Sequence, residues 1–257
     1  MNLKAIAFIA ALPLSSIAQE LNFGVHLNPT LTVPIIDGAS TFDKEIGRRQ
    51  RIGYNMGANI NYKNGPVSVE TGVNVVNKAV QFRQHIIDVY AGGSSYYYTR
   101  FTGTGTEVPL LLGYRAFHNT GKNPYDFYIQ AGGSYEFFSN NGIAGGSRVY
   151  ADGSVAINTG SPGYIPWENY EWFNAVVGFK INTIVKKVGL IDYGMTYHLP
   201  FEYAGPYRTT AEVISTSGSH TYSGTFRPIL SYLDLKLCYY FLNYNKGFSR
   251  IKYRKTS

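Results

Sequence analysis

The sequence predicts an all-β fold, an eight-stranded antiparallel up-and-down transmembrane β-barrel. About eight stretches of roughly ten residues carry an apolar or aromatic side chain at every second position, as strands with one apolar face do. The connections between these stretches are alternately short and long. The chain opens on a segment that is typical of a secretory signal peptide. Barrels that span a bacterial outer membrane combine these three features.

The alternation is clearest in the segment 51–62. One face carries Ile52, Tyr54, Met56, Ala58, Ile60 and Tyr62, and the other carries Gly53, Asn55, Gly57, Asn59 and Asn61. By the same criterion we expect strands at 22–33, 51–62, from 67 onward, and at 106–117, 125–138, 171–182, 188–199 and 225–241.

The connections predict how the barrel is oriented. Short connections are expected at 63–66, with the hairpin signal Asn64-Gly65, at 118–124 and at 183–187. Long connections are expected at 34–50, 82–105, 139–170 and 200–224. Transmembrane barrels have short periplasmic turns and long external loops, so both termini should be periplasmic.

The two ends of the chain are expected to lie outside the barrel. Lys4, an apolar core at 5–14 and the small-residue site Ser16-Ile17-Ala18 predict a signal peptide at 1–18, followed by a barrel at 19–241. A basic periplasmic tail, 242–257, holds Lys246, Arg250, Lys252, Arg254 and Lys255 without an acid. Most of the formal charge of +7 lies in this tail, so we expect no nucleic-acid partner.

The content of the polar faces favours a membrane barrel over a secreted lipocalin-like barrel. These faces are rich in Gly, Asn, Ser and Thr, which suit the crowded lumen of an eight-stranded barrel. Their charged residues are expected to pair as a polar network in the lumen, since an unpaired buried charge is costly. The predicted network consists of Glu70, Glu107, Arg115, Glu136, Lys180, Asp192, Asp234 and Lys236. A gated path for ions or protons is the alternative.

The run from Thr106 to Arg115, Thr-Glu-Val-Pro-Leu-Leu-Leu-Gly-Tyr-Arg, resembles the fourth strand of the PorT-like outer-membrane β-barrel family of Bacteroidetes-type bacteria. Residues 128–135 and 234–241 are similar to the fifth and last strands of that family. The resemblance implies an outer-membrane barrel, and PorT itself is associated with the type IX secretion machinery. The basic extension after Phe241 departs from the family pattern.

Aromatic residues in the long connections form candidate binding surfaces. Tyr96, Tyr97, Tyr98 and Trp167 are interpreted as loop residues that bind a glycan or a protein, or as part of the aromatic girdle at the membrane interface. The girdle is favoured for Tyr170 and Trp172, which adjoin a strand.

The histidines and the single cysteine carry weaker signals. His85, His198 and His220 are expected in or near external loops, and His26 and His118 in structural positions. No nucleophile-elbow motif accompanies them, so we expect no catalytic residues. Cys238 is the only cysteine, which excludes a disulfide. We also expect no metal site and no cofactor.

The predicted function is therefore that of a non-enzymatic integral outer-membrane barrel, an interaction or assembly component and an accessory of type IX secretion. Its expected partners are outer-membrane lipid and secretion-system or other envelope proteins. A small or gated pore for small solutes is the alternative, and a lipid-modifying enzyme comes third.

Overall fold

The structure is a computed structural model, and it describes residues 19–37, 46–88, 93–121, 124–145, 147–149, 155–157, 170–185, 188–201, 207–215, 218–245 and 249–250. Long strands form the wall of the molecule: β1 (Gln19–Asp37), β2 (Ile46–Asn64), β3 (Val67–Asp88), β4 (Gly93–Asn119), β5 (Tyr125–Gly145), β8 (Tyr170–Val185), β9 (Gly189–Pro200) and β11 (Gly218–Asn245). Shorter strands are β6 (Ser147–Val149), β7 (Val155–Ile157), β10 (Tyr207–Ser215) and β12 (Ser249–Arg250).

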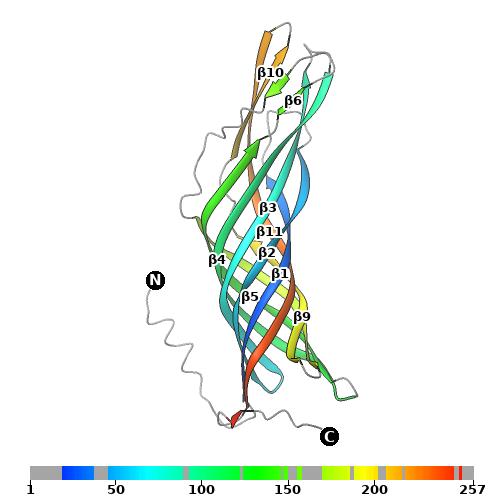
Figure 1. The fold of residues 1–257 in the computed structure, drawn as a ribbon, viewed down its shortest axis with the longest axis vertical. Coiled ribbons are helices and arrows are strands. Elements are labelled where there is room, and N and C mark those ends of the chain that lie inside the picture. Colours follow the sequence, from blue (N-terminus) through cyan, green and yellow to red (C-terminus); the bar gives the residue numbers. More distant parts are fainter. Residues whose placement is uncertain are drawn as a thin grey trace.

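Within the described residues, eight antiparallel strands close into a barrel in the order β1-β2-β3-β4-β5-β8-β9-β11. The seam is the pairing of β1 with β11, which runs from Glu20 opposite Asn245 to Asp37 opposite Arg227. Figure 1 shows the wall as a tall cylinder of tilted strands, with β10 and β6 at one end. The predicted fold class is confirmed.

The three short connections are confirmed as short, because the strands that they join stay paired as far as Asn64 and Val67, Asn119 and Tyr125, and Val185 and Gly189. Asn64 lies opposite Val67, so the predicted hairpin is present, but its two-residue loop is Gly65-Pro66 and not Asn64-Gly65. Gly65 has a φ of 58°, the left-handed conformation that a tight hairpin turn requires. The other two turns join β4 to β5 and β8 to β9. The end of the barrel with these connections is called the short-turn end below, and the opposite end the long-loop end.

The wall continues well beyond the predicted strands at the long-loop end. A transmembrane strand needs about ten residues, whereas β4 has 27. The predicted loop at 82–105 is wrong, because β3 and β4 stay paired from Val67–Tyr114 up to Asp88–Gly93. There the backbone ladder continues past the part of the sequence in which apolar residues alternate.

A small extra sheet stands in the region where the sequence predicts loops at 139–170 and 200–224. β10 pairs with the outer part of β11, β7 pairs with β10, and β6 pairs with β7. Their ladders satisfy the backbone groups that open loops would leave to water.

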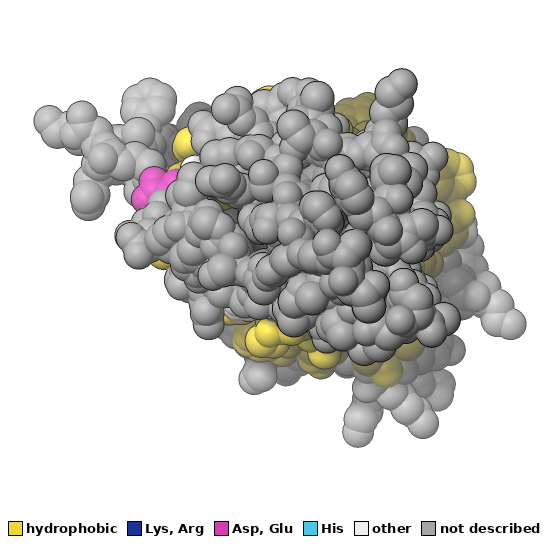
Figure 2. Space-filling model, turned by 90° about the horizontal axis from the view of Figure 1, so that it is seen from above, with side chains coloured by type: hydrophobic (Ala, Val, Ile, Leu, Met, Phe, Trp, Pro, Cys, Tyr) yellow, Lys and Arg dark blue, Asp and Glu magenta, His cyan; other side chains and the backbone are white. Residues whose placement is uncertain are grey.

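The two faces of the wall have opposite chemistry. Large hydrophobic side chains are exposed on the outside, among them Leu27, Val73, Leu112, Ile129, Val177 and Leu237. The inward positions between them are buried and mostly polar. Seen from above, hydrophobic side chains show at several places around the rim of the molecule (Figure 2).

This inside-out pattern defines a transmembrane β-barrel of the outer-membrane type. In a soluble barrel the apolar face would be buried and the charges exposed, and here both are reversed. No helix among the described residues is long and apolar enough to cross a bilayer.

At the C-terminal end, β11 continues through the first residues of the expected tail as far as Asn245. β12 then folds back so that Arg250 lies opposite Tyr244. Residues 251–257 and the expected signal peptide at 1–18 lie outside the described residues.

Candidate functional site

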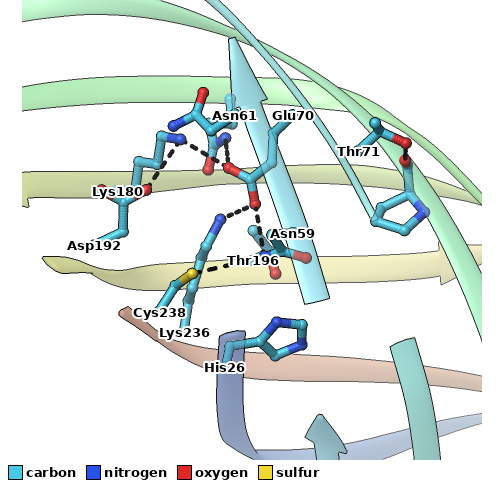
Figure 3. Close-up of polar contacts among 12 residues, drawn as sticks. His26, Asn59, Asn61, Glu70, Thr71, Lys180, Asp192, Thr196, Lys236 and Cys238 are labelled. Carbon is cyan, nitrogen blue, oxygen red and sulfur yellow. Dashed lines mark hydrogen bonds and ion pairs between the residues drawn. The ribbon is translucent and has the colours of Figure 1, made fainter. Parts of the chain in front are cut away.

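Glu70 of β3 is the centre of a group of buried ion pairs in the lumen. Its carboxylate accepts hydrogen bonds from Lys180 Nζ at 2.7 Å, across the lumen on β8, and from Lys236 Nζ on β11. Asn59 and Gln130 donate to the same carboxylate at 3.3 Å each. Figure 3 shows Lys180 and Lys236 reaching Glu70 from two sides. Four strands are thus tied to one side chain.

The network of ion pairs around Glu70 continues toward the short-turn end. Lys180 Nζ also lies 3.2 Å from Asp192 Oδ2, and Tyr240 donates to that oxygen at 2.8 Å. Asn182 donates to the other oxygen of Asp192 and accepts a hydrogen bond from Lys63 Nζ at 2.7 Å. The short-turn cluster is defined by Lys63, Glu70, Lys180, Asn182, Asp192, Lys236 and Tyr240.

A second cluster lies nearer the long-loop end. Lys78 Nζ is 2.7 Å from Glu136 Oε2, and both side chains are buried. The indole of Trp172 donates to Glu136 at 2.9 Å. The ammonium of Lys78 also lies over the rings of Trp172 and Tyr232, 5.4 Å and 4.6 Å from their centroids. Ion pairing and cation–π contacts together compensate this buried charge.

Glu107 joins that cluster directly opposite Glu136 in the β4–β5 ladder. It accepts a hydrogen bond from Tyr232 at 2.8 Å, and its carboxylate oxygen lies 3.0 Å from His198 Nδ1. The other ring nitrogen of His198 is 3.0 Å from the hydroxyl of Thr196. The long-loop cluster is defined by Lys78, Glu107, Glu136, Trp172, Thr196, His198 and Tyr232.

Asp234 lies between the two clusters and is held by neutral groups. Its Oδ2 accepts hydrogen bonds from Asn55 at 2.8 Å and from Asn28 at 3.2 Å. His26, which is also buried, has its Nε2 3.1 Å from the amide oxygen of Asn55. A cavity of about 20 Å³ adjoins these residues.

The structure places seven of the eight predicted lumen residues inside the barrel, namely Glu70, Glu107, Glu136, Lys180, Asp192, Asp234 and Lys236. Arg115 does not join them. Its side chain is 30% exposed at the short-turn end, where it lies 3.7 Å from Asp126. His118, in the adjoining turn, is 2.5 Å from the same carboxylate.

Two residues lie elsewhere than predicted. The sequence favours Trp172 for the aromatic girdle, but this side chain is 2% exposed and points into the lumen. His198 is expected in or near an external loop, but it is buried beside Glu107. Along a strand, successive side chains point to opposite faces of the wall. Trp172 directly precedes Phe173, which is exposed on the outer face, so the alternation assigns Trp172 to the inner face. The same rule assigns His198 to the inner face.

The predicted aromatic loop residues are largely in a strand. Tyr96, Tyr97 and Tyr98 belong to β4, where they pair with His85, Gln84 and Arg83 of β3. The backbone ladder there explains why the loop prediction is wrong for them. Trp167 lies outside the described residues. His220 lies in β11, opposite Val213 of β10.

The sequence patterns do not single out Lys63, Lys78 or the buried asparagines of β1 and β8, whereas the alternation does place the buried asparagines of β2 on the polar face. Lys78 follows Glu70 by eight residues, an even number, so it points to the same face. If the predicted strand that begins at Val67 had been extended beyond its apolar part, the alternation would have placed Lys78 in the lumen. No group of three or more His, Cys, Asp or Glu side chains among the described residues is arranged to hold a metal ion.

Comparisons with known proteins find similar solved structures among outer-membrane proteins. No protein-family model matches the chain, and no curated protein does. A major outer membrane protein from Thermus thermophilus is 12% identical, with 86% of this chain and 99% of that one covered and a TM-score of 0.39. Outer membrane protein W of E. coli is 15% identical, with 86% and 97% covered and a TM-score of 0.34.

Outer membrane protein AlkL, solved in lipid bilayers, is 12% identical, with 90% of this chain and 95% of that one covered and a TM-score of 0.32. These likenesses concern the fold alone. The resemblance of residues 106–115 to the PorT-like family stays a prediction.

Proposed function

We propose that this protein is a non-enzymatic outer-membrane barrel with a closed lumen, and that it acts as an interaction or assembly component of the cell envelope. The observation that carries the proposal is the filled lumen. The short-turn cluster and the long-loop cluster occupy successive levels of the barrel, and the cavity between them measures only about 20 Å³. That is room for about one water molecule.

The ion pairs favour a permanent closure. Glu70 binds lysines from β8 and β11, and Lys78 of β3 binds Glu136 of β5. Opening a passage would separate these partners and leave buried charges unpaired, at a cost of about 3–5 kcal/mol for each broken pair. A small solute in the passage would make no contacts that compensate this cost.

A closed lumen leaves the ends of the barrel as the surfaces for binding. The paired extension of β3 and β4 and the sheet of β10, β7 and β6 stand at the long-loop end. We assign this end to the cell exterior and both termini to the periplasm, since outer-membrane barrels carry their long connections outside.

Thr196, His198 and Glu107 do not form an accessible catalytic site, although His198 lies 3.0 Å from the hydroxyl of Thr196 and 3.0 Å from the carboxylate of Glu107. All three side chains are buried. The adjoining cavity has room for one water but not for a lipid. These observations support a non-enzymatic role.

Planar-bilayer recording tests the closed lumen. Purified protein in lipid should show no stable unitary conductance, and regular conductance steps would contradict the proposal in favour of a pore. A porin in the same bilayer is the positive control.

Native purification in mild detergent tests the interaction role. Stoichiometric co-elution of envelope proteins is expected, and type IX secretion proteins among them would support the accessory role. The Tyr97→Ala and Trp167→Ala double variant should fold but bind less of any partner. A barrel that elutes alone under all mild conditions would contradict the assembly role.

A further inference from the structure

The pairing of β2, β3 and β4 places three arginines on the outer face of the wall. Figure 1 shows β3 and β4 running together to the long-loop end, and they keep one register over their whole length. Residues an even number of positions apart share a face of a strand. Arg83 follows Val75 by eight residues, and Arg100 precedes Val108 by eight. Both arginines therefore belong to the face on which Val75 and Val108 are exposed.

Arg49 of β2 joins the other two arginines through Gln81 of β3. Gln81 lies directly opposite Arg49 in the β2–β3 ladder and directly opposite Arg100 in the β3–β4 ladder. Residues directly opposite each other share a face, so the two arginines flank Gln81. Arg83 lies two residues further along β3. With strands about 4.8 Å apart and a rise of about 3.4 Å per residue, the Cα atoms of the three arginines are about 8–10 Å from one another.

The surroundings of the three arginines on this face hold no acid to balance their charge. Asp88 is the one acidic residue in the paired stretches of this part of the wall, which are 46–50, 77–88, 93–104 and 140–145. It follows Arg83 by five residues, an odd number, so it belongs to the opposite face. Like charges that are neighbours on one face of a sheet repel each other. A bound anion relieves this repulsion.

The position of Arg49 along its strand matches the level of lipid headgroups. Ile52 of β2 is 76% exposed and belongs to the apolar outer face. Arg49 lies three residues further toward the long-loop end. In a strand tilted by about 40°, three residues advance about 8 Å along the membrane normal. The headgroup region is about 5–8 Å thick on each side of the hydrocarbon core. Arg49 therefore lies at the outer edge of this region.

We propose that Arg49, Arg83 and Arg100 form a binding site for the phosphate groups of an outer-leaflet glycolipid. Arginine suits this ligand, because its planar guanidinium binds phosphate oxygens through parallel hydrogen bonds. Basic clusters beside membrane-spanning segments bind phosphate headgroups in the same way. The acyl chains of the lipid then pack on the exposed apolar side chains of β3 and β4. The choice of leaflet rests on the proposed function, which assigns the long-loop end to the cell exterior.

Binding of lipid A in detergent micelles tests the site. Folded protein in a non-ionic detergent is titrated with diphosphoryl lipid A, and native mass spectrometry measures the lipid retained on each barrel. Wild-type protein should bind this form about tenfold or more tightly than dephosphorylated lipid A. Arg83→Gln should weaken the binding of diphosphoryl lipid A about tenfold, the loss expected when one charge-assisted hydrogen bond is removed. The same variant should bind dephosphorylated lipid A as the wild type does.

Arg48→Gln is the matched control. Arg48 adjoins Arg49 on β2 but lies opposite Phe82 of β3, which directly precedes Arg83, so Arg48 belongs to the inner face. The control removes the same charge at nearly the same level, and its affinity for diphosphoryl lipid A should stay near that of the wild type. If Arg83→Gln fails to fold, Arg100→Gln gives the same comparison on β4.

Equal affinity of the wild type for the two forms of lipid A would overturn the site, and so would equal losses in Arg48→Gln and Arg83→Gln. Displacement of lipid A by an equimolar amount of inorganic phosphate would overturn the lipid as the ligand, because its acyl chains would then contribute nothing. Binding in micelles depends neither on conductance nor on co-eluting proteins. Its failure would therefore leave the closed lumen and the assembly role standing, so the two proposals fail separately.

Discussion

Single residues inside the barrel carry more polar contacts than the sequence suggests. Trp172 is an example, because an aromatic residue at a strand end is usually assigned to the membrane interface. Its indole instead donates to Glu136 and lies near the ammonium of Lys78. The position of the residue on its strand, odd or even, decides between the two assignments, and the chemical type of the side chain does not.

The environment of Trp172 can be measured by fluorescence. In a Trp167→Phe variant, Trp172 is the single tryptophan, since the chain has two. Its emission should resist quenching by brominated lipid, because the lumen excludes acyl chains. Moving the indole by one residue, with Trp172→Phe and Phe173→Trp in the same background, should give strong quenching, since Phe173 is exposed on the outer face. Equal quenching of the two would place Trp172 in the lipid.

At the scale of the element, close strand contacts explain why glycine recurs on the inner face. A Cβ added at Gly178 of β8 would lie 2.2 Å from the backbone oxygen of Met195 and 2.8 Å from Cα of Thr196. Gly65 is different, because nothing lies within 4 Å of an added Cβ and only its φ of 58° is restrictive.

The two glycines therefore predict different costs when changed to alanine. Gly65→Ala should lower the free energy of unfolding by about 1–2 kcal/mol, the cost of a left-handed alanine. Gly178→Ala should lower it by about 3 kcal/mol or prevent folding, because strand backbones must move apart. Urea unfolding in lipid vesicles measures both. A smaller effect at Gly178 than at Gly65 would contradict the close approach of β8 and β9.

The sequence predicts these elements well only where they cross the membrane. The eight strands and the three short turns follow from the alternation and from signals such as Asn64-Gly65. The outer part of β4, around Tyr97, could not be recognised, because its sequence, with Tyr at 96, 97 and 98, does not alternate apolar and polar residues.

The sequence predicts that the charged residues of the lumen form ion pairs, but it does not predict which residues pair with each other. That Glu70 needs buried cations follows from its place on the polar face. That Lys180 and Lys236 supply them depends on the stagger of strands 110 and 166 residues away in the chain. Arg115 shows a related limit of the sequence pattern. Its position in the alternation assigns it to the inner face, but the alternation does not show that it lies at the end of the barrel, where its side chain is partly exposed.

At the scale of the whole molecule, the outer apolar band sets the position of the barrel in lipid. Leu112, 58% exposed, lies near the middle of the apolar part of β4, whereas Phe117, 54% exposed, lies near its short-turn end. The two side chains are similarly exposed and lie at different depths along the same strand.

Arginine at these two positions should have unequal effects. Leu112→Arg should destabilise the barrel in lipid vesicles by about 2–4 kcal/mol, and Phe117→Arg by about 1 kcal/mol or less, because a charge costs most at the bilayer centre. Unfolding by denaturant in vesicles measures both. Equal, small effects would indicate a barrel whose outer face meets water.

The pairing of β1 with β11 constrains when the chain can fold during its synthesis. Asn28 near the start of the wall bonds Asp234 near its end, 206 residues later, and Glu20 lies opposite Asn245. The N-terminal end of a growing chain is made first. Until β11 has been synthesised, the chain lacks both the strand that closes the barrel and Lys236, which binds Glu70. Until the last strand arrives, the earlier ones hold unpaired edges and unmatched charges. The barrel therefore cannot close before the complete polypeptide is present, because its first and last strands complete each other's ladders.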